Sequence, residues 1–374
     1  MPAGSPLWLL CCVGALSITS SIALPAQAAK PLPATPDPCA STSPSYEQNW
    51  AGFPAFAYII QTNQTNKTPS SYEVRLGSKN GVCSRRVGGI EVGRAGETSF
   101  ARNGADYVIA WVASGGNAMV SRFESTLAVP GATAIPATAA VFRNGVNSLD
   151  LAPDAGYLVY TSLASYPDLL IRVADLLDIQ DATGASDALI QAVQTSGLIS
   201  LWWAPWDKIY YNPMDAASGK RILALDPLSG SEQEPVTLLT LPAIGPMVVN
   251  TLFQVGRLSG GVLSGTPAVV FQGFYVTGVK MNGASGSWCV AAYAVDANAN
   301  DLFLIGSLTA PNSIGGFEIS VTLDSTVLFQ KSSAPTSGSS CNRTGYLGEA
   351  RLTVDSAASV LSQVPGSWPA ALKQ

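Results

Sequence analysis

The 374-residue chain contains no histidine. This absence excludes Ser-His-Asp and Cys-His nucleophile activation, a histidine-ligated zinc site and a histidine proton relay. The chain also lacks a GxSxG nucleophile elbow, a GxxxxGK[ST] phosphate loop and the Ser-x-Asp-x-Gly-x-Thr-Trp boxes of sialidases. Serine-hydrolase, P-loop NTPase and sialidase chemistry therefore have no support, while catalysis by paired carboxylates stays open.

Charged side chains are scarce, at 12 % of the chain, which is about half the usual share. The 25 acidic residues outnumber the 20 basic ones. Nucleic-acid binding needs clustered Lys and Arg to neutralise phosphates, so we expect no nucleic-acid partner and no polybasic membrane patch. The short basic pair Arg85-Arg86 is interpreted as a solvated strand edge rather than an anion site.

The apolar run from Leu7 to Leu16 is short and is followed by small residues and an Ala26-Gln27-Ala28 cleavage pattern. This order predicts a secretory signal peptide over residues 1–28, although the run is preceded by no Lys or Arg; a buried N-terminal helix is the less favoured alternative. No other stretch has the roughly 18 apolar residues that a transmembrane helix needs. We therefore expect a secreted, extracellular protein without a transmembrane segment, with a Pro/Ala/Ser-rich leader over 29–45 and a single domain over 46–374.

Four cysteines remain after residue 28, an even number in a chain expected to reach an oxidising compartment. They predict two disulfides, formed by Cys39, Cys83, Cys289 and Cys341. Three pairings are open. We favour Cys39 with Cys83 and Cys289 with Cys341 because these close the shorter loops, although a closed ring could bring Cys39 near Cys341. No CxxC element is present, which argues against a zinc site.

Three Asn-x-Thr sequences match the glycan acceptor pattern, at Asn63, Asn66 and Asn342. The first two lie together in a Thr/Asn-rich stretch of turn composition. We expect at least one of them to carry a glycan if the chain is made by a eukaryote.

An apolar strand motif recurs six times with a spacing of about 50 to 60 residues, which is typical of a radial array of small sheets. The copies are Tyr58–Gln61, Tyr107–Ala110, Tyr157–Tyr160, Ile209–Asn212, Val269–Gln272 and Val327–Gln330. The sequence thus predicts an all-β fold, a six-bladed β-propeller. Two β-sandwich domains divided near Pro246 are the alternative.

Turn-forming residues separate the apolar runs. They include Asn80-Gly81, Asn103-Gly104, Asn144-Gly145 and Asn282-Gly283, which can supply the positive φ angles of tight hairpins. The segment from Ala204 to Gly230, where Pro-Trp-Asp-Lys precedes an aromatic strand, resembles one blade of the TolB-like and YWTD-like six-bladed propellers, and the unit after Pro153 is similar. The resemblance implies a fold and not an activity. A single helix is expected over Ser186–Ser196, because Leu189, Ile190 and Val193 follow helical spacing.

The densest aromatic cluster contains Trp202, Trp203, Trp206, Tyr210 and Tyr211. Exposed aromatic faces stack on sugar rings and apolar ligands, so Trp206, Trp202 and Tyr210 are candidate binding residues. Strand alternation places Trp202 and Trp203 on opposite faces, and packing between blades is the favoured role of the cluster as a whole. Trp206 lies in a turn and is the best candidate for exposure.

Acidic residues near turns could in principle face one cleft, although most of them are better explained as caps of their own backbone. They are Asp106, Asp154, Asp168, Asp207 and Asp324. Asp296, Asn298 and Asn300 alternate as calcium ligands do, but the loop lacks the Gly and Glu of a full calcium loop, and a plain hairpin turn explains it equally well. Calcium is the one cofactor that the sequence leaves open.

These observations favour a binding or scaffold module that recognises an extracellular protein or carbohydrate through loops at the mouth of the propeller channel. We assign no catalytic residue. The competing hypothesis is a secreted propeller hydrolase or lactonase that uses carboxylates, with or without calcium. It predicts several acidic or amide side chains at the channel mouth, at least one of them buried with a raised pKa.

Overall fold

The strands of the protein belong to one compact unit, Asp37–Gln374. The computed structural model describes residues 37–61, 70–130, 134–165, 168–176, 187–194, 199–213, 221–227, 232, 234–241, 252–263, 265–278, 287–298, 304–308, 319–321, 326–332, 345–351, 359–365 and 367–373. None of the helices within these ranges is long and apolar enough to cross a membrane. The two short helical segments are α1 (Tyr46–Asn49) and the 3-10 turn Ser125–Leu127.

The remaining elements are strands, which form four sheets of four strands and one sheet of nine. The sheet of nine consists of two blades joined through β25 and β4, plus one short extra strand, so the described strands make six blades of four, which we number from the N-terminus. Blade 1 contains β25 (Ser367–Lys373), β1 (Phe56–Gln61), β2 (Ser71–Gly77) and β3 (Ser84–Val92). Blade 2 contains β4 (Ala95–Asn103), β5 (Asp106–Ala113), β6 (Asn117–Glu124) and β8 (Ala139–Arg143). Blade 3 contains β9 (Val146–Leu151), β10 (Tyr157–Ser165), β11 (Asp168–Asp175) and β12 (Asp187–Gln194).

Blades 4 to 6 follow the same order, from the inner strand outward. Blade 4 contains β13 (Ile199–Ala204), β14 (Lys208–Pro213), β15 (Arg221–Leu225) and β16 (Val236–Thr240). Blade 5 contains β17 (Leu252–Leu263), β18 (Thr266–Gly278), β19 (Ser287–Asp296) and β20 (Leu304–Leu308). Blade 6 contains β21 (Ile319–Val321), β22 (Thr326–Ser332), β23 (Gly345–Arg351) and β24 (Ser359–Pro365). The short strand β7 (Ala134–Ile135), from the β6–β8 connection, pairs with the outer strand of blade 1.

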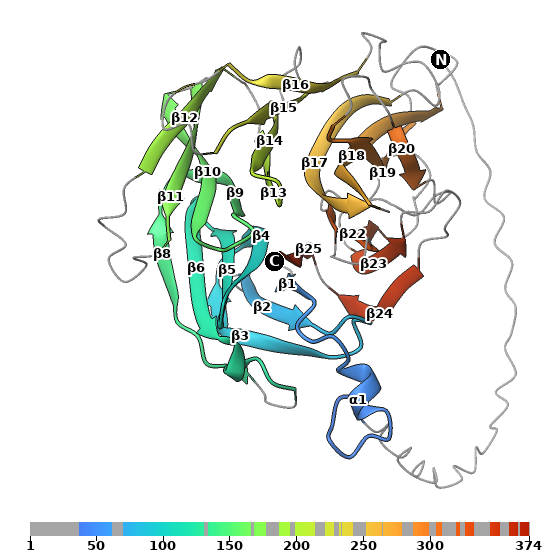
Figure 1. Ribbon diagram of the computed structural model, residues 1–374. Helices are drawn as coiled ribbons and strands as arrows, with labels where there is room; N and C mark the ends of the chain where they lie inside the picture. The colour runs from blue at the N-terminus through green and yellow to red at the C-terminus, as the bar shows by residue number, and fades with distance from the viewer. Residues whose placement is uncertain are drawn as a thin grey trace, which may run out of the picture. The chain divides into compact units, whose positions relative to one another are not determined.

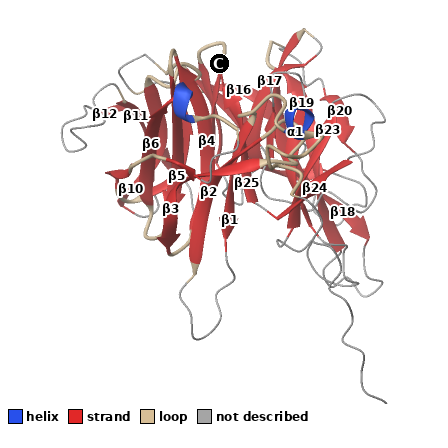
Figure 2. Ribbon diagram, turned by 90° about the horizontal axis from the view of Figure 1, so that it is seen from below, coloured by secondary structure: helices blue, strands red, loops and turns tan. Residues whose placement is uncertain are grey.

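The inner strands of the six blades form a closed ring. They contact one another in the order β4, β9, β13, β17, β21, β25, and β25 returns to β4. Figure 1 shows this arrangement within Asp37–Gln374, with the end of β25 near the axis, and Figure 2 shows the strands from the side. The ring closes through β25, which pairs antiparallel with β1 and parallel with β4, so that the two ends of the unit share one sheet.

The six repeats found in the sequence are the second strands of the six blades: β1, β5, β10, β14, β18 and β22. A second strand packs against a neighbouring blade on each face, so consecutive residues along its centre are apolar, as Val108, Ile109 and Ala110 of β5 are, each 0 % exposed. The propeller prediction is confirmed, and the alternative of two β-sandwich domains is wrong.

Apolar cores fill the space between neighbouring blades, and the aromatic pair of β13 shows how. Trp202 packs in the core between blades 4 and 5, whereas Trp203 packs in the core between blades 3 and 4, stacked on Tyr157. The alternation of strand side chains thus serves two interfaces at once. Burying each large apolar side chain stabilises the fold by about 2–3 kcal/mol.

Hydrogen bonds from one inner strand to the next form a second layer of contact around the ring. In five of the six junctions, a side-chain oxygen accepts the backbone N–H of the next inner strand. The pairs are Ser99 with Leu151 (3.0 Å), Asp150 with Trp203 (2.6 Å), Ser200 with Leu258 (3.0 Å), Ser259 with Val321 (3.2 Å) and Ser320 with Ala371 (2.8 Å). The sixth junction is the parallel pairing of β25 with β4. These bonds satisfy amides that face the axis of the ring.

The helix predicted over Ser186–Ser196 is wrong, because this segment forms strand β12, paired with β11. The register shifts between the pairs Leu189↔Arg172 and Gln191↔Ile171, which leaves Ile190 as an extra, bulged residue. The bulge shifts the alternation by one position, so the buried residues Ile190 and Val193 are three apart. Buried residues three positions apart are typical of a helix, which is why the sequence predicted one here.

The interpretation of Arg85-Arg86 as a solvated edge is wrong for Arg85, which is 1 % exposed. Its guanidinium donates to the carbonyl oxygens of Leu127 (3.1 Å) and Ala134 (2.7 Å), and to that of Val129. Burial lowers the pKa of Arg85. The side chain thus fastens the β6–β8 connection of blade 2 to blade 1.

Candidate functional site

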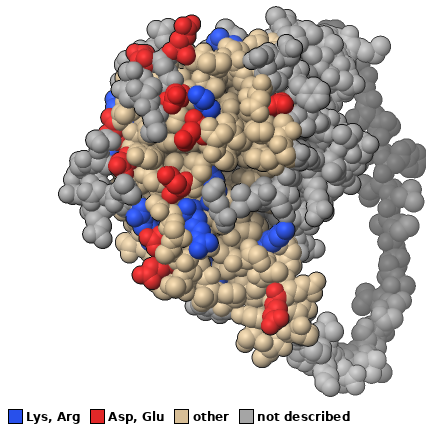
Figure 3. Space-filling model, viewed as in Figure 1, with Lys and Arg blue, Asp and Glu red and all other residues tan. Residues whose placement is uncertain are grey.

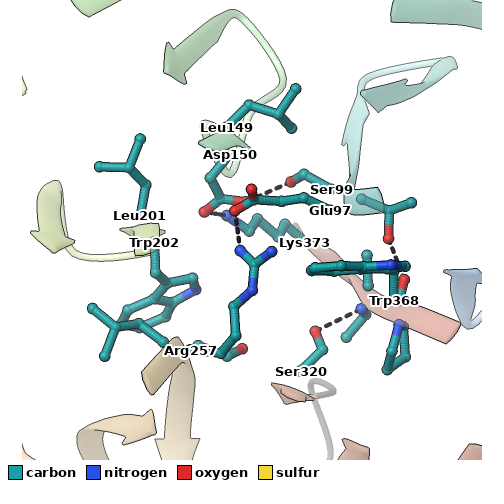
Figure 4. Close-up of a pocket in the computed structure, with 16 residues that line it drawn as sticks. Glu97, Ser99, Leu149, Asp150, Leu201, Trp202, Arg257, Ser320, Trp368 and Lys373 are labelled. Carbon is teal, nitrogen blue, oxygen red and sulfur yellow. Dashed lines mark hydrogen bonds and ion pairs between the residues drawn. The ribbon is translucent and has the colours of Figure 1, made fainter. Parts of the chain in front are cut away.

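A polar cavity lies on the axis of the ring, and residues of all six inner strands line it. Its volume is about 50 Å³, which is room for about four water molecules. Four charged side chains reach it from four different strands: Glu97 (β4), Asp150 (β9), Arg257 (β17) and Lys373 (β25). Figure 4 shows them converging beside the ring of Trp368.

The first pair of charges joins blade 5 to blade 2 across the channel. Arg257 donates to Oε1 of Glu97, which also accepts a hydrogen bond from Ser148 at 2.6 Å. The guanidinium of Arg257 lies 4.4 Å from the centre of the Trp368 ring, which is suitable for a cation–π contact. Glu97 is 8 % exposed at its side chain and Arg257 is 19 % exposed, so water screens this pair little.

Local backbone irregularities direct both members of this pair into the channel. The ladder of β4 with β5 shifts register between Gly96 and Thr98, and Glu97 lies in this bulge with a φ of +44°. Arg257 lies in a second bulge, between Val255 and Leu258 of β17. Bulges re-aim side chains, and positive φ at a non-glycine residue is strained backbone of the kind that gathers at functional sites.

Two neighbours hold these bulges in place. Asn212 of β14 is fully buried and donates to the carbonyl oxygens of Val255 and Gly256, at the start of the β17 bulge. Trp368, also at positive φ (+56°), packs against Gly96, where an added Cβ would lie 3.1 Å from its ring. A larger residue at position 96 would press on the ring of Trp368, which glycine allows to lie close against β4.

The second pair joins blade 1 to blades 3 and 4. Lys373 donates to Oδ2 of Asp150 and to the carbonyl oxygens of Leu151 (2.8 Å) and Trp203 (3.1 Å). Asp150 also accepts from Ser99 Oγ at 2.6 Å. The carboxylate of Asp150 is thus satisfied by one cation, one hydroxyl and one backbone amide, which is the condition for burying an ionised group at low cost.

Burial shifts the pKa values of two of the four charged groups. It raises the pKa of Glu97, and the Arg257 guanidinium and the Ser148 hydroxyl oppose this rise. It lowers the pKa of Lys373, and the Asp150 carboxylate opposes this change. Each group therefore depends on its partner to stay charged. In chemical terms, the cavity offers two engaged carboxylates, two engaged cations and one aromatic face.

The acids that the sequence singled out are not the acids of this cavity. Asp154 caps its own turn by accepting the N–H of Gly156 at 2.9 Å, and Asp207 lies exposed in the β13–β14 turn at a φ of +56°. Asp106 begins β5, one strand removed from the channel. Asp324 and the side chain of Asp168 lie outside the described residues.

The aromatic candidates form one packed group at the boundary of blades 4 and 5. Trp202 and Tyr210 are buried, with their rings stacked at 5.7 Å, and Trp202 also lines the cavity. Trp206 is half-buried, lies edge-on to Trp202 at 5.4 Å and donates its Nε1–H to the hydroxyl of Tyr210 at 2.9 Å. Packing is the evident role of Trp202 and Tyr210, while part of Trp206 reaches solvent.

In the candidate calcium loop, Oδ1 of Asp296 accepts the backbone N–H of Asn298 at 2.7 Å, as in an Asx turn. Asn300 lies outside the described residues. Across the part of the chain that the structure describes, no three acidic or cysteine side chains gather as metal ligands.

The disulfide predicted between Cys39 and Cys83 is present and connects the segment before α1 to the β2–β3 turn. The side chain of Cys289 and the whole of Cys341 are not among the described residues, and neither are the glycan acceptors Asn63, Asn66 and Asn342.

In Figure 3, acidic and basic side chains of the described surface lie interspersed on the face that is drawn.

Sequence reasoning missed all four charged residues of the cavity. The available signal was a charge between two apolar residues of a strand, as with Asp150 between Leu149 and Leu151, in a chain where charge is scarce. A buried charge needs a partner, so each such residue calls for a second one elsewhere. Which residue becomes that partner is decided only when the ring closes and brings distant strands together.

Comparison with known proteins places this architecture among the propellers. No family model and no curated protein matches the sequence. Among solved structures, TolB from Acinetobacter baumannii is similar with a TM-score of 0.52 at 12% identity, over 86% of this chain and 68% of that one. A putative TolB from Agrobacterium tumefaciens gives 0.46 at 12% identity, over 74% of this chain and 86% of that one.

The β-propeller domain of the Trilobed protease from Pyrococcus furiosus gives a TM-score of 0.41 at 10% identity, over 79% of this chain and 77% of that one. The fold of this chain is a β-propeller, similar to that of TolB. At this level of identity the likeness concerns the fold alone, so function has to be argued from the site.

Proposed function

We propose that this chain is an exported β-propeller module that binds an extracellular protein or glycan at the mouth of its central channel without converting it. The observation that carries the proposal is the size and composition of the axial cavity. A space of about 50 Å³ admits one projecting group, such as a sugar substituent or the tip of a side chain. The rest of the ligand then has to lie on the surrounding loops.

The state of the carboxylates supports binding over catalysis. General acid and nucleophile roles need a carboxylate whose proton or lone pair is available to the substrate. Glu97 is engaged by Arg257 and Ser148, and Asp150 by Lys373, Ser99 and the Trp203 amide. Carboxylates engaged in this way have little capacity left to transfer a proton or attack a substrate, which favours binding.

Export is supported by three features. The disulfide between Cys39 and Cys83 is of the kind that persists in oxidising compartments. The segment 1–28 has the order of a signal peptide, and three glycan acceptor sequences occur in the chain.

A second candidate function, a hydrolase or lactonase, is favoured by one specific observation at Glu97. This carboxyl is buried, has a raised pKa and lies at a strained φ within reach of the charge of Asp150. Catalytic acids share these properties, because a proton retained near neutral pH can be given to a leaving group.

One experiment separates the two functions. The chain from residue 29 onward is applied to an array of neutral and acidic oligosaccharides and to a panel of extracellular proteins, and is incubated with aryl glycosides, aryl esters and lactones. Saturable binding with no product by mass spectrometry is expected. Turnover that disappears in Glu97→Gln but persists in Asp226→Asn, which removes an exposed acid, would instead establish the hydrolase.

A variant pair then locates the bound ligand. Arg257→Gln changes the cavity wall, and Arg221→Gln changes an exposed arginine at the start of β15. For a ligand at the channel mouth we expect binding to weaken about tenfold in the first variant and to be unchanged in the second, because a charged hydrogen bond contributes about 1.5–3 kcal/mol. If both variants bound the ligand with equal affinity, the binding site would not be at the channel mouth.

A further inference from the structure

Three oxygen atoms converge on the ammonium group of Lys373. They are Oδ2 of Asp150 and the carbonyl oxygens of Leu151, at 2.8 Å, and Trp203, at 3.1 Å. An ammonium group has three N–H donors and no acceptor, so this set satisfies every donor of Lys373. The lysine enters from β25 of blade 1, while the oxygens come from β9 of blade 3 and β13 of blade 4.

The oxygens are held in place independently of the lysine. Asp150 is fixed by Ser99 Oγ at one oxygen and by the Trp203 amide at the other, both at 2.6 Å. Leu151 and Trp203 belong to inner strands paired with β10 and β14. None of the three oxygens belongs to β25, so the cradle keeps its shape if the lysine is removed.

The cradle is also shielded from water. The side chain of Asp150 is 9 % exposed and that of Lys373 is 15 % exposed. One carboxylate and two carbonyl dipoles directed at one point in such a place favour a single positive charge with three donors. A cation without N–H donors cannot make the same hydrogen bonds.

We infer that Asp150, Leu151 and Trp203 form a preorganised binding site for one primary ammonium group, and that β25 supplies this group as Lys373 to lock the ring. The lock lies next to the closing junction of the ring, where β25 pairs in parallel with β4 through Leu372↔Phe100 and Lys373↔Ala101. β25 is already attached to blades 1, 2 and 6, and Lys373 extends this attachment to blades 3 and 4.

A chemical-rescue experiment tests this inference. In Lys373→Ala the cradle is empty of its ammonium, and we expect the melting temperature to fall by about 5 °C. Methylammonium chloride is then titrated against tetramethylammonium chloride at equal ionic strength. We expect methylammonium to restore at least half of the lost stability in a saturable manner, and to restore protection of the β25 and β1 amides in hydrogen exchange.

Two control variants make the rescue specific. Lys208→Ala removes an exposed ammonium group 3.8 Å from Asp226, and methylammonium should not affect it differently from tetramethylammonium. In Lys373→Ala combined with Asp150→Asn, the cradle loses its charge and rescue should disappear.

Several outcomes overturn the inference: no rescue, equal rescue by both salts, or rescue that persists in the double variant. If Lys373→Ala does not fold, Lys373→Met keeps the aliphatic stem and vacates only the nitrogen position, so ammonium chloride replaces methylammonium chloride in its titration. If neither variant folds alone, folding promoted by methylammonium and not by tetramethylammonium supports the site, and failure in both salts overturns it.

Discussion

Ion pairs join different blades both in the channel and at the rim of the propeller, which is formed by the outer strands. The two kinds of pair differ in which blades they connect. At the rim, Arg143 of β8 binds Asp187 of β12 with two hydrogen bonds, at 2.9 and 2.7 Å, between neighbouring blades 2 and 3. In the channel, Arg257 reaches from blade 5 to Glu97 of blade 2. The rim pair repeats a contact that the apolar core between the same blades already makes, whereas the channel pairs connect blades that share no core.

The acids of the channel pairs are also more deeply buried than the acid of the rim pair. The rim pair is 16 and 20 % exposed, and Arg143 also covers the ring of Phe142 at 4.4 Å. The acids of the channel are 8 and 9 % exposed, and one of them lies on strained backbone. Loss of one partner should therefore cost more in the channel, because the remaining charge is left buried and unpaired.

The largest effect is expected for Asp150→Asn. This change leaves the ammonium of Lys373 without its counter-charge, and we expect the free energy of unfolding to fall by about 3–5 kcal/mol. Denaturant unfolding followed by tryptophan fluorescence measures it. Asp226→Asn is the matched control, since that acid is 57 % exposed, and it should leave stability unchanged. Equal losses in the two variants would contradict a special role for the channel.

A smaller, pH-dependent loss is expected for Arg257→Gln. Without the guanidinium, burial raises the pKa of Glu97 further above its unfolded value, so the folded state holds this proton more strongly than the unfolded state. Stability is then retained below about pH 4.5 and lost as pH rises through the pKa of the folded state. Unfolding measured at pH 4.5 and pH 7 should show a larger loss against wild type at pH 7. A loss of stability that did not depend on pH would show that the loss does not come from the ionisation of Glu97.

The rim pair should respond less. For Arg143→Gln we expect a loss of about 1 kcal/mol, since the pair is partly hydrated and an apolar core lies next to it. The same denaturant series as for the channel variants measures this loss. A loss as large as that of Asp150→Asn would remove the distinction between channel and rim.

The smallest effect is expected at the rim, as a change in the pKa of one tyrosine that can be followed by spectroscopy. Burial, together with the Asp187 carboxylate that accepts from its hydroxyl at 2.6 Å, raises the pKa of Tyr160 to about 12. Asp187→Asn removes the charge, so the pKa of one tyrosine should move down toward 10 in an ultraviolet titration. An unchanged titration would show that Asp187 does not control Tyr160.

Sequence reasoning recovered the blades because each second strand is buried on both faces and shows as a continuous apolar run, as in Tyr107–Ala110. It could not recover the site. Glu97, Asp150, Arg257 and Lys373 come from inner strands far apart in sequence and meet only when the ring closes. The bulges that aim Glu97 and Arg257 depend on pairing with neighbouring strands, which local residue types do not encode.

The same limit explains the mistaken helix at Ser186–Ser196. There a bulge at Ile190 altered the burial period, and only the partner strand reveals it. Arg85 was misjudged for a related reason, because the carbonyl oxygens that surround it belong to residues 42 to 49 positions later in the chain.

The central claim is that charges tie distant blades together across the channel. A double-mutant cycle of Asp150→Asn and Lys373→Met, with Arg143→Gln and Asp187→Asn as the reference cycle, tests it most directly. We predict a coupling energy of at least about 2 kcal/mol for the channel pair, clearly above the value for the rim pair. Additive effects of the two channel substitutions, with a coupling near zero, would contradict the account.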